Sequence, residues 1–164
     1  MIEIIHAGID DIAVIRRLAE EIWFPTYLPI LPEGQADYMF GKFYTIEALR
    51  EQMQQDGHSF LLAYDEGVPA GFASYSLIAT DIVKLHKLYV LPSTQGRGIG
   101  AALLDQVSDE ARKLSATKLI LYVNKYNHSA QKFYERKGLR IFKSEIIEIG
   151  QEFVMDDYVL ELNL

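Results

Sequence analysis

The chain has 164 residues, of which 49% are hydrophobic and 24% are charged, and its formal net charge is −7. This length and composition predict a single globular domain over residues 1–164 that can bury a hydrophobic core. The acidic balance argues against a nucleic-acid partner, because such a partner needs clustered lysine and arginine. No apolar stretch approaches the roughly 20 residues of a membrane span, and the N-terminus does not look like a signal peptide. We therefore expect a cytoplasmic protein with no membrane partner.

The absence of cysteine restricts the chemistry that the chain can perform. Without thiols there can be no disulfide, no thiolate metal site and no cysteine nucleophile. His6, His58 and His128 show no metal-ligand spacing with one another. We therefore expect no metal site.

The first half of the chain predicts a strand, two helices and a hairpin. Residues 2–6 read as a short strand, and a helix over 10–22 follows with its apolar residues on one face. Three prolines make 23–34 a loop. A second helix opens at Thr45. Two β-rich runs around the turn at 65–67 then predict a hairpin.

The second half of the chain predicts four strands and two helices. In chain order they are a strand over 82–90 stopped by Pro92, a helix over 98–113, a strand over 118–123, a helix over 127–137 ended by Gly138, and strands near 139–149 and 153–162. The whole order predicts an α+β fold, with a mixed, mostly antiparallel sheet of about seven strands and helices on both faces.

The stretch PSTQGRGIGAALL, residues 92–104, places three glycines before an apolar run. Glycine allows tight turns and lets successive N–H groups point into one concavity. The apolar residues that follow recur at helical spacing, so the loop lies at a helix N-terminus. Free N–H groups at a helix N-terminus form an anion site, and phosphate is its usual ligand.

Several kinds of loop fit these glycines in part. A Walker A loop needs a lysine after its second glycine, and none follows Gly100, which excludes it. Gly96, Gly98 and Ala101 fit the G-x-G-x-x-G/A dinucleotide pattern. That pattern should be followed by an acidic residue at the end of the next strand, but this strand ends in LYVNKYN without one. A turn that only caps the helix also fits the loop by itself.

A third pattern, Gln/Arg-x-x-Gly-x-Gly/Ala after a strand ending in Val-x-Pro, fits at every position. It is met by Gln95, Gly96, Arg97, Gly98, Ile99 and Gly100, which follow Val90, Leu91 and Pro92. Later in the chain, Asn127, Ala130, Tyr134 and Gly138 match the pattern Asn-x-x-Ala-x-x-x-Tyr-x-x-x-Gly. The two motifs resemble those of the GNAT superfamily of acetyl-CoA-dependent N-acetyltransferases, and the resemblance covers most of the chain.

This resemblance implies a GNAT fold and acetyl-CoA as the cosubstrate. It implies that the cofactor is held by Leu88, Tyr89, Val90, Gln95, Gly96, Arg97, Gly98, Ile99, Gly100, Asn127, Ala130 and Tyr134. In the family, the tyrosine at the place of Tyr134 gives its proton to the departing CoA thiolate, a role that suits a phenol because it is neutral at pH 7. Packing is the alternative role for Tyr134, and helix capping alone is the alternative for Asn127.

His86 is the second candidate catalytic residue. Strict alternation along 82–90 places it on the face of Lys84 and Leu88, opposite to Lys87. Polyamine acetyltransferases commonly have a glutamate four residues before the valine of Val-x-Pro, which is the place of His86 here. A histidine with a pKa near 6.5 can take the proton of a substrate ammonium, directly or through water. We therefore expect kcat/KM to rise with pH through about 6–7. The alternative role of His86 is only to pair with a neighbouring residue.

Four further segments, less specific than the two motifs, resemble those of the PaiA-type spermine/spermidine acetyltransferases. They are the early Trp23…Thr26-Tyr27 segment, KLHKLYV, FYERKGL and VMDDYVLELNL. The resemblance implies a polyamine or another small cationic amine as the acceptor. Trp23 and Tyr27 are the expected acceptor-binding aromatics, with Glu33 or Asp37 for a distal cation, and plain packing is their alternative role. The amine should attack the thioester directly in a ternary complex, because no cysteine can carry the acetyl group.

Two other functions fit the same motifs. A protein or peptide N-terminal acetyltransferase would present an open groove rather than a closed acidic pocket. A non-catalytic acyl-CoA-binding module would keep the loop without the chemistry, and an intact Tyr134 argues against it. The sequence leaves open which amine is the acceptor and whether the protein forms a homodimer.

Overall fold

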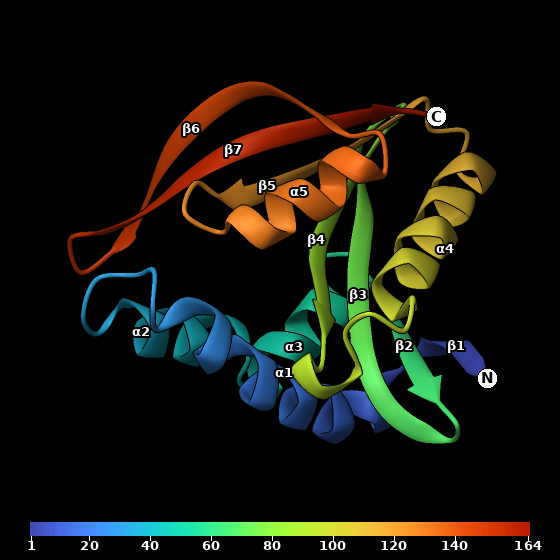
Figure 1. The fold of residues 1–164 in the computed structure, drawn as a ribbon, viewed down its shortest axis with the longest axis horizontal. Coiled ribbons are helices and arrows are strands. Elements are labelled where there is room, and N and C mark those ends of the chain that lie inside the picture. Colours follow the sequence, from blue (N-terminus) through green and yellow to red (C-terminus); the bar gives the residue numbers. More distant parts are fainter.

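The computed structural model describes residues 1–164, and its centre is a seven-stranded sheet (Figure 1). In chain order the strands are β1 (Ile2–Ala7), β2 (Ser59–Asp65), β3 (Val68–Ala79), β4 (Ile82–Val90), β5 (Lys118–Asn124), β6 (Arg140–Gly150) and β7 (Phe153–Asn163). Their order across the sheet is β1-β2-β3-β4-β5-β7-β6, and only β4 and β5 run parallel. The predicted α+β fold with a mostly antiparallel sheet is confirmed.

Helices cover both faces of the sheet and enclose a hydrophobic core on each side (Figure 1). One face carries α4 (Ile99–Lys113) and α5 (His128–Arg136), and the other carries α1 (Ile12–Tyr27), α2 (Gln35–Phe43) and α3 (Ile46–Gln54). Phe60 and Leu61 of β2 enter different cores, because successive strand side chains point to opposite faces. None of the helices has the length and apolar character needed to cross a bilayer.

The first helix is longer than the sequence predicts. The predicted end is Ile22, but α1 continues through Pro25 to Tyr27. A proline inside a helix removes a backbone hydrogen bond and costs about 3 kcal/mol. Here the loss falls in the last turn, where the buried ring of Trp23 packs 4.2 Å from that of Tyr27. Burial of these rings offsets the missing bond and extends the helix.

The sequence prediction assigns no element to the residues of α2. The helix is short, contains Gly41 and starts after Gly34, whose φ is +84° and which has no capping side chain. Its local helix signals are therefore weak. Met39 and Phe40 are nevertheless buried on one face of α2. Packing of this face against the rest of the fold decides the structure, as it does for most short helices.

The middle of the sheet opens because β4 and β5 pair over only part of their length. Residues 82–85 of β4 pair with 118–121 of β5, whereas β4 stays beside β3 as far as Val90. Beyond this point β4 and β5 diverge (Figure 1). The backbone groups of residues 86–90 that point toward β5 therefore have no strand partner, which leaves them available to a ligand.

A β-bulge at His86 changes the alternation along β4. Ser74 of β3 pairs with Lys87 and Tyr75 pairs with Leu85, so His86 has no partner residue on β3. One extra residue in a strand turns the following side chains to the opposite face. His86 and Lys87 consequently line the same pocket. The prediction that they lie on opposite faces is wrong, because it assumed an uninterrupted strand.

The β6–β7 hairpin is bonded to α2 at the edge of the molecule (Figure 1). The Tyr38 hydroxyl and the Lys42 ammonium donate to the Ile149 carbonyl at 2.6 and 2.9 Å. The Gln35 amide donates to the Val154 carbonyl at 2.6 Å. These bonds fix the distance between the helical layer and the hairpin.

Candidate active site

A cleft of about 500 Å³ lies where β4 and β5 diverge. Of the residues expected to hold the cofactor, the cleft is lined by Leu88, Tyr89, Val90, Gln95, Gly96, Gly98, Ile99, Gly100, Asn127, Ala130 and Tyr134. They belong to β4, the glycine loop, the first turn of α4 and the α5 region. The two sequence motifs, although separated along the chain, thus form the walls of one cavity of a size typical of ligand sites.

The glycine loop presents unpaired N–H groups at the start of α4. The N–H groups of Gly96, Gly98, Ile99, Gly100 and Ala101 have no backbone acceptor. Gly96 and Gly98 have φ of +87° and +83°, which residues with a side chain rarely adopt. A Cβ added at Gly98 would meet no atom within 4 Å, so the backbone conformation and not a lack of space requires glycine in the unliganded chain. The arrangement suits an anion such as phosphate.

Arg97 differs from the other residues of its motif. Its side chain points to the β2–β3 hairpin, where Nε lies 2.8 Å from Oδ2 of Asp65. Its backbone N–H donates to the Thr94 carbonyl at 3.3 Å. Arg97 does not line the cleft, because its ion pair with Asp65 directs the side chain away from it.

Asn127 and Tyr134 are placed by α5, which forms one wall of the cleft. The Asn127 side chain accepts a hydrogen bond from the Ala130 N–H at 3.4 Å and caps the helix. Tyr134 is 8% exposed and lines the cleft. Burial, with a smaller effect of Tyr27, raises the pKa of Tyr134 above its usual value of 10. The phenol is therefore a proton donor at neutral pH.

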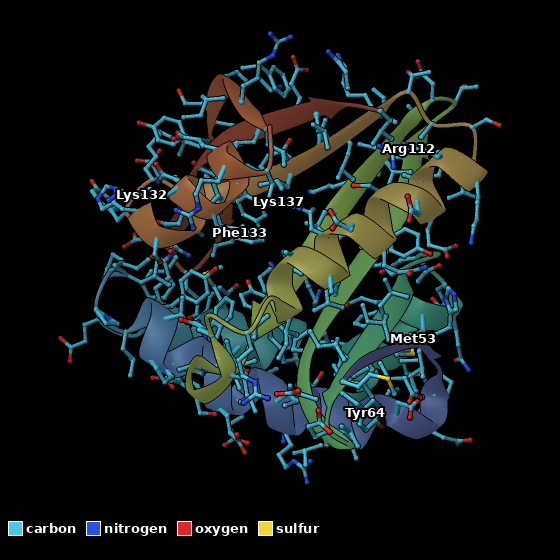
Figure 2. All side chains as sticks on the ribbon, turned by 45° about the vertical axis from the view of Figure 1, so that its right-hand side comes forward. Met53, Tyr64, Arg112, Lys132, Phe133 and Lys137 are labelled. Carbon is cyan, nitrogen blue, oxygen red and sulfur yellow. The ribbon has the colours of Figure 1, made fainter.

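The position of α5 is fixed by contacts with α4. Lys137 Nζ lies 2.9 Å from Oδ1 of Asp105 on α4. The Phe133 ring packs over Gly100, where an added Cβ would lie 3.5 Å from the ring. Figure 2 shows Phe133 and Lys137 reaching from α5 toward α4. These contacts set the distance between Tyr134 and the glycine loop.

A second pocket of about 390 Å³ adjoins the cleft, between helices α1–α3, β4 and the β6–β7 hairpin. Its larger apolar and aromatic lining residues are Trp23, Tyr27, Leu31, Met39, Phe43, Tyr44, Leu85, Tyr89, Tyr122, Ile147 and Met155. Its charged or titratable groups include Asp56, His58, Lys84, His86, Lys87 and Asp157. We call this cavity the acceptor pocket, because it meets the cleft along β4.

Of the residues expected to bind the acceptor, Trp23 and Tyr27 line this pocket. The Trp23 indole N–H donates to the Ala36 carbonyl at 2.9 Å, so only its ring is available to a ligand. The Tyr27 hydroxyl lies 3.1 Å from that of Tyr89. Burial raises the pKa of both phenols above 10, which keeps these groups neutral where the pocket meets the cleft.

Glu33 and Asp37 lie outside the acceptor pocket. Both are exposed on the surface, in the turn before α2 and on its first turn. The sequence places them near the aromatic residues, but α2 turns their carboxylates to solvent and presents Met39 to the pocket. The carboxylates that do line the pocket are Asp56 and Asp157.

His86 lies at the junction of the cleft and the acceptor pocket. Its Nε2 is 2.6 Å from the Ser76 hydroxyl, and its ring stacks on His58 with centres 3.9 Å apart. Burial, followed by His58 and two lysines, lowers the pKa of His86 to about 3. This pKa lies below the range of pH 6–7 that the sequence leads us to expect for His86. No group of three or more histidine, aspartate and glutamate side chains is arranged to hold a metal ion.

Asp157 is a polar group of the pocket that the sequence analysis missed. It lies on β7 opposite Asn124 of β5, and it is buried. Burial and the neighbouring Asp156 raise the pKa of Asp157 to about 6. The signal available in the sequence was the pair of adjacent acids in a strand, since alternation sends one of the two side chains inward.

The comparisons with known proteins agree with this geometry. The acetyltransferase (GNAT) family profile matches residues 10–139. The chain is 30% identical over 139 residues to an uncharacterised N-acetyltransferase of Mycobacterium tuberculosis (strain ATCC 25618 / H37Rv), covering 84% of this chain and 88% of the relative. It is 26% identical over 159 residues to the spermidine N(1)-acetyltransferase of Thermoplasma acidophilum, covering 94% and 96%. The solved structure of the PaiA N-acetyltransferase of Thermoplasma acidophilum, in complex with coenzyme A, matches with a TM-score of 0.86 at 24% identity, over 100% of this chain and 99% of that chain.

The chain belongs to the acetyltransferase (GNAT) family, because the family profile covers most of its length. It is an N-acetyltransferase with the GNAT fold. The predicted likeness to the PaiA-type enzymes is also confirmed by the sequence match and the structural match to Thermoplasma acidophilum.

Proposed function

We propose that the chain transfers an acetyl group from acetyl-CoA to the primary amine of a small molecule. The observation that carries this proposal is the meeting, in one cleft, of the unpaired N–H groups of the glycine loop and the protonated phenol of Tyr134. The N–H groups suit the pyrophosphate of the cofactor, and the phenol suits the sulfur that leaves. Family membership and the coenzyme A bound to the PaiA protein support the same assignment.

The reaction we propose is a direct transfer in a ternary complex. Backbone N–H groups of 86–90 that have no strand partner would bind the thioester oxygen and the pantetheine arm. The amine nitrogen forms a bond to the acetyl carbon, and the carbon–sulfur bond breaks. Tyr134 gives its proton to the CoA thiolate, and the proton lost by the amine goes to a general base.

Asp157 fits the role of the base better than His86. With a pKa of about 6, Asp157 is mostly ionised at pH 7 and still holds a proton better than an ordinary carboxylate. His86 is neutral at that pH, but a pKa of about 3 makes it a weak base. We therefore propose Asp157 as the base, acting directly or through a water molecule, with His86 shaping the pocket wall together with Ser76.

A small acceptor suits the pocket better than a peptide. The bonds from Gln35 and Tyr38 of α2 to the hairpin close the side of the pocket between these elements. The polyamine expected from the sequence has support in the spermidine relative. Lys84 and Lys87, however, balance Asp56 and Asp157 in the lining. We therefore propose the wider class of small primary amines.

The cytoplasmic location and the homodimer stay predictions from the sequence. The acetyl donor and the acceptor are the two small-molecule partners that the proposed reaction requires. Nothing in the proposed chemistry uses a metal, a nucleic acid or a membrane.

The test of the cofactor site is Gly98→Val. At a φ of +83° a β-branched residue is strained, and either it distorts the loop or its side chain enters the space of the pyrophosphate. Loss of hydrogen bonds to the phosphate costs about 1–3 kcal/mol, so the Kd for acetyl-CoA should rise by about 5- to 150-fold. Calorimetric titration with acetyl-CoA measures this change.

Gly57→Val is the matched control, because Gly57 also has a positive φ, of +72°, and open space around it, but lies outside both pockets. It should impose similar strain and leave the Kd unchanged. Equal affinities of the folded Gly98→Val and wild-type proteins would refute the proposed site.

A further inference from the structure

Lys87 is a buried cation for which the chain supplies no counter-ion. The residue is 9% exposed on β4 and lines the acceptor pocket. Its Nζ lies 5.3 Å from the ring centre of Tyr44 and 5.9 Å from that of Phe60. No ion pair or hydrogen bond occupies the three donors of the ammonium group, and a buried charge without a partner is costly. Such a group is expected where a ligand provides the partner.

No carboxylate of the region forms an ion pair with Lys87, and none raises its pKa. Burial lowers the pKa of both Lys84 and Lys87. The negative charges of Asp157 and Glu145 partly restore the pKa of Lys84, whereas no carboxylate does so for Lys87. Burial and Lys84 lower the pKa of Lys87 to about 8, so the group stays mostly protonated at pH 7. Asp56 acts on His58. Lys84 and Lys87 both lack an ion pair, and Lys87 is the more buried of these two positive charges of the acceptor pocket.

This charge pattern disfavours an acceptor with several ammonium groups. A second ammonium near Lys87 or Lys84 would meet a like charge in a partly desolvated cavity. A carboxylate in the same place would gain a charge-assisted hydrogen bond to Lys87. The single ammonium group of the acceptor would share Asp157 with Lys84. The pocket thus suits a zwitterion better than a dication.

One part of the pocket wall is apolar. Trp23, Leu31, Met39, Phe43, Ile147 and Met155 contribute to it, and a volume of about 390 Å³ leaves room for a small apolar group. Lys87 also lines the cofactor cleft, so a carboxylate bound there lies close to the reacting amine. The acceptor should therefore carry its carboxylate close to its amine, as a molecule with both groups on the same carbon does.

We propose that the acceptor is an apolar α-amino acid, whose carboxylate binds Lys87 and whose side chain lies against the apolar wall of the acceptor pocket. This inference rests on the proposed acetyl transfer and specifies its acceptor. It gives Lys87 the role of a specificity-determining residue. The amine of the bound amino acid then faces the thioester from the junction of the two cavities.

The experiment compares acceptors that differ only in the carboxylate. Wild-type kcat/KM is measured for phenylalanine and for phenethylamine, and a second pair, leucine and its decarboxylated amine, covers a smaller side chain. We expect the amino acid to be preferred by about 10- to 100-fold, the range of a charge-assisted hydrogen bond. In Lys87→Met this preference should fall by a similar factor, through KM.

Two controls separate specificity from folding. Lys87→Met removes an unpaired buried charge while keeping the side-chain length, so its thermal midpoint should rise by several degrees. Lys143→Met changes an exposed lysine of β6 that lines neither cavity, and it should keep the wild-type preference. Because the wild-type comparison needs no variant, the inference can be tested even if Lys87→Met folds poorly.

Three outcomes would each overturn a different claim. Acetylation of phenethylamine or spermidine at least as fast as of the amino acids overturns this inference and leaves the proposed acetyl transfer intact. A preference that survives in folded Lys87→Met overturns the role of Lys87. No release of CoA with any amine overturns the proposed function together with the inference.

Discussion

Replacing Tyr134 with phenylalanine is expected to lower kcat by about 100-fold, the usual contribution of a positioned general acid. The ring and its packing are kept, and only the hydroxyl is lost. Since the raised pKa keeps this phenol protonated, the proton for the CoA thiolate is always present in the wild-type enzyme. The affinity for acetyl-CoA should change little, because the glycine loop is untouched. Steady-state kinetics and calorimetry on the same preparations measure the two quantities.

Tyr126→Phe is the matched control. Tyr126 precedes α5, is exposed and lines neither cavity, so loss of its hydroxyl should leave kcat unchanged. If Tyr134→Phe also keeps the wild-type kcat, Tyr134 serves only in packing. A loss of acetyl-CoA affinity of similar size would make Tyr134 a binding residue and not the acid.

Asp157→Asn is expected to lower kcat/KM by about 100-fold at neutral pH and to change the pH profile. In the wild-type enzyme the carboxylate must be ionised to accept a proton, so kcat/KM should rise with pH through about 6, the pKa of Asp157. Asparagine cannot accept that proton, and the limb should disappear. A second limb at higher pH belongs to the ammonium group of the acceptor and should remain in the variant.

Two further variants assign the limb. Asp156 is paired with Lys125 and contributes to the raised pKa of Asp157, so Asp156→Asn should keep the limb and move it to lower pH. His86→Ala should also keep a limb, because His86 does not titrate near neutrality. If the limb near pH 6 survives in Asp157→Asn and vanishes in His86→Ala, His86 is the base, as the sequence analysis expects, and Asp157 is not.

The parts of the fold that follow local rules could be predicted from the sequence. All seven strands, α4, α5 and the glycine loop were placed within a few residues, because hydrophobic periodicity and glycine positions mark them directly. The end of α1 and the whole of α2 were not. In both cases tertiary packing, of Trp23 and of the buried face of α2, outweighs an unfavourable proline or glycine.

The candidate site shows the same division. Of the twelve residues that the sequence assigns to the cofactor, all except Arg97 line the cleft, because they belong to two contiguous motifs. The cleft also has lining residues that the motifs do not contain, such as Thr26 of α1 and Leu121 of β5. The acceptor pocket is assembled from seven helices and strands, most of them remote in sequence. The bulge at His86 turns Lys87 into this pocket, and β7 adds Asp157. Neither the bulge nor the lowered pKa of His86 has a local sequence signal, because both depend on neighbouring strands.

The most direct test of the account is a measurement of free CoA thiol and acetylated product in a single reaction. The wild-type protein is incubated with acetyl-CoA and, in parallel, with apolar amino acids, monoamines, spermidine or a peptide with a free N-terminus. We expect free thiol and an N-acetylated small amine to form in equal amounts, only when an amine is present. Binding of acetyl-CoA without release of thiol by any of these acceptors would contradict the proposed reaction and reduce the chain to a cofactor-binding module.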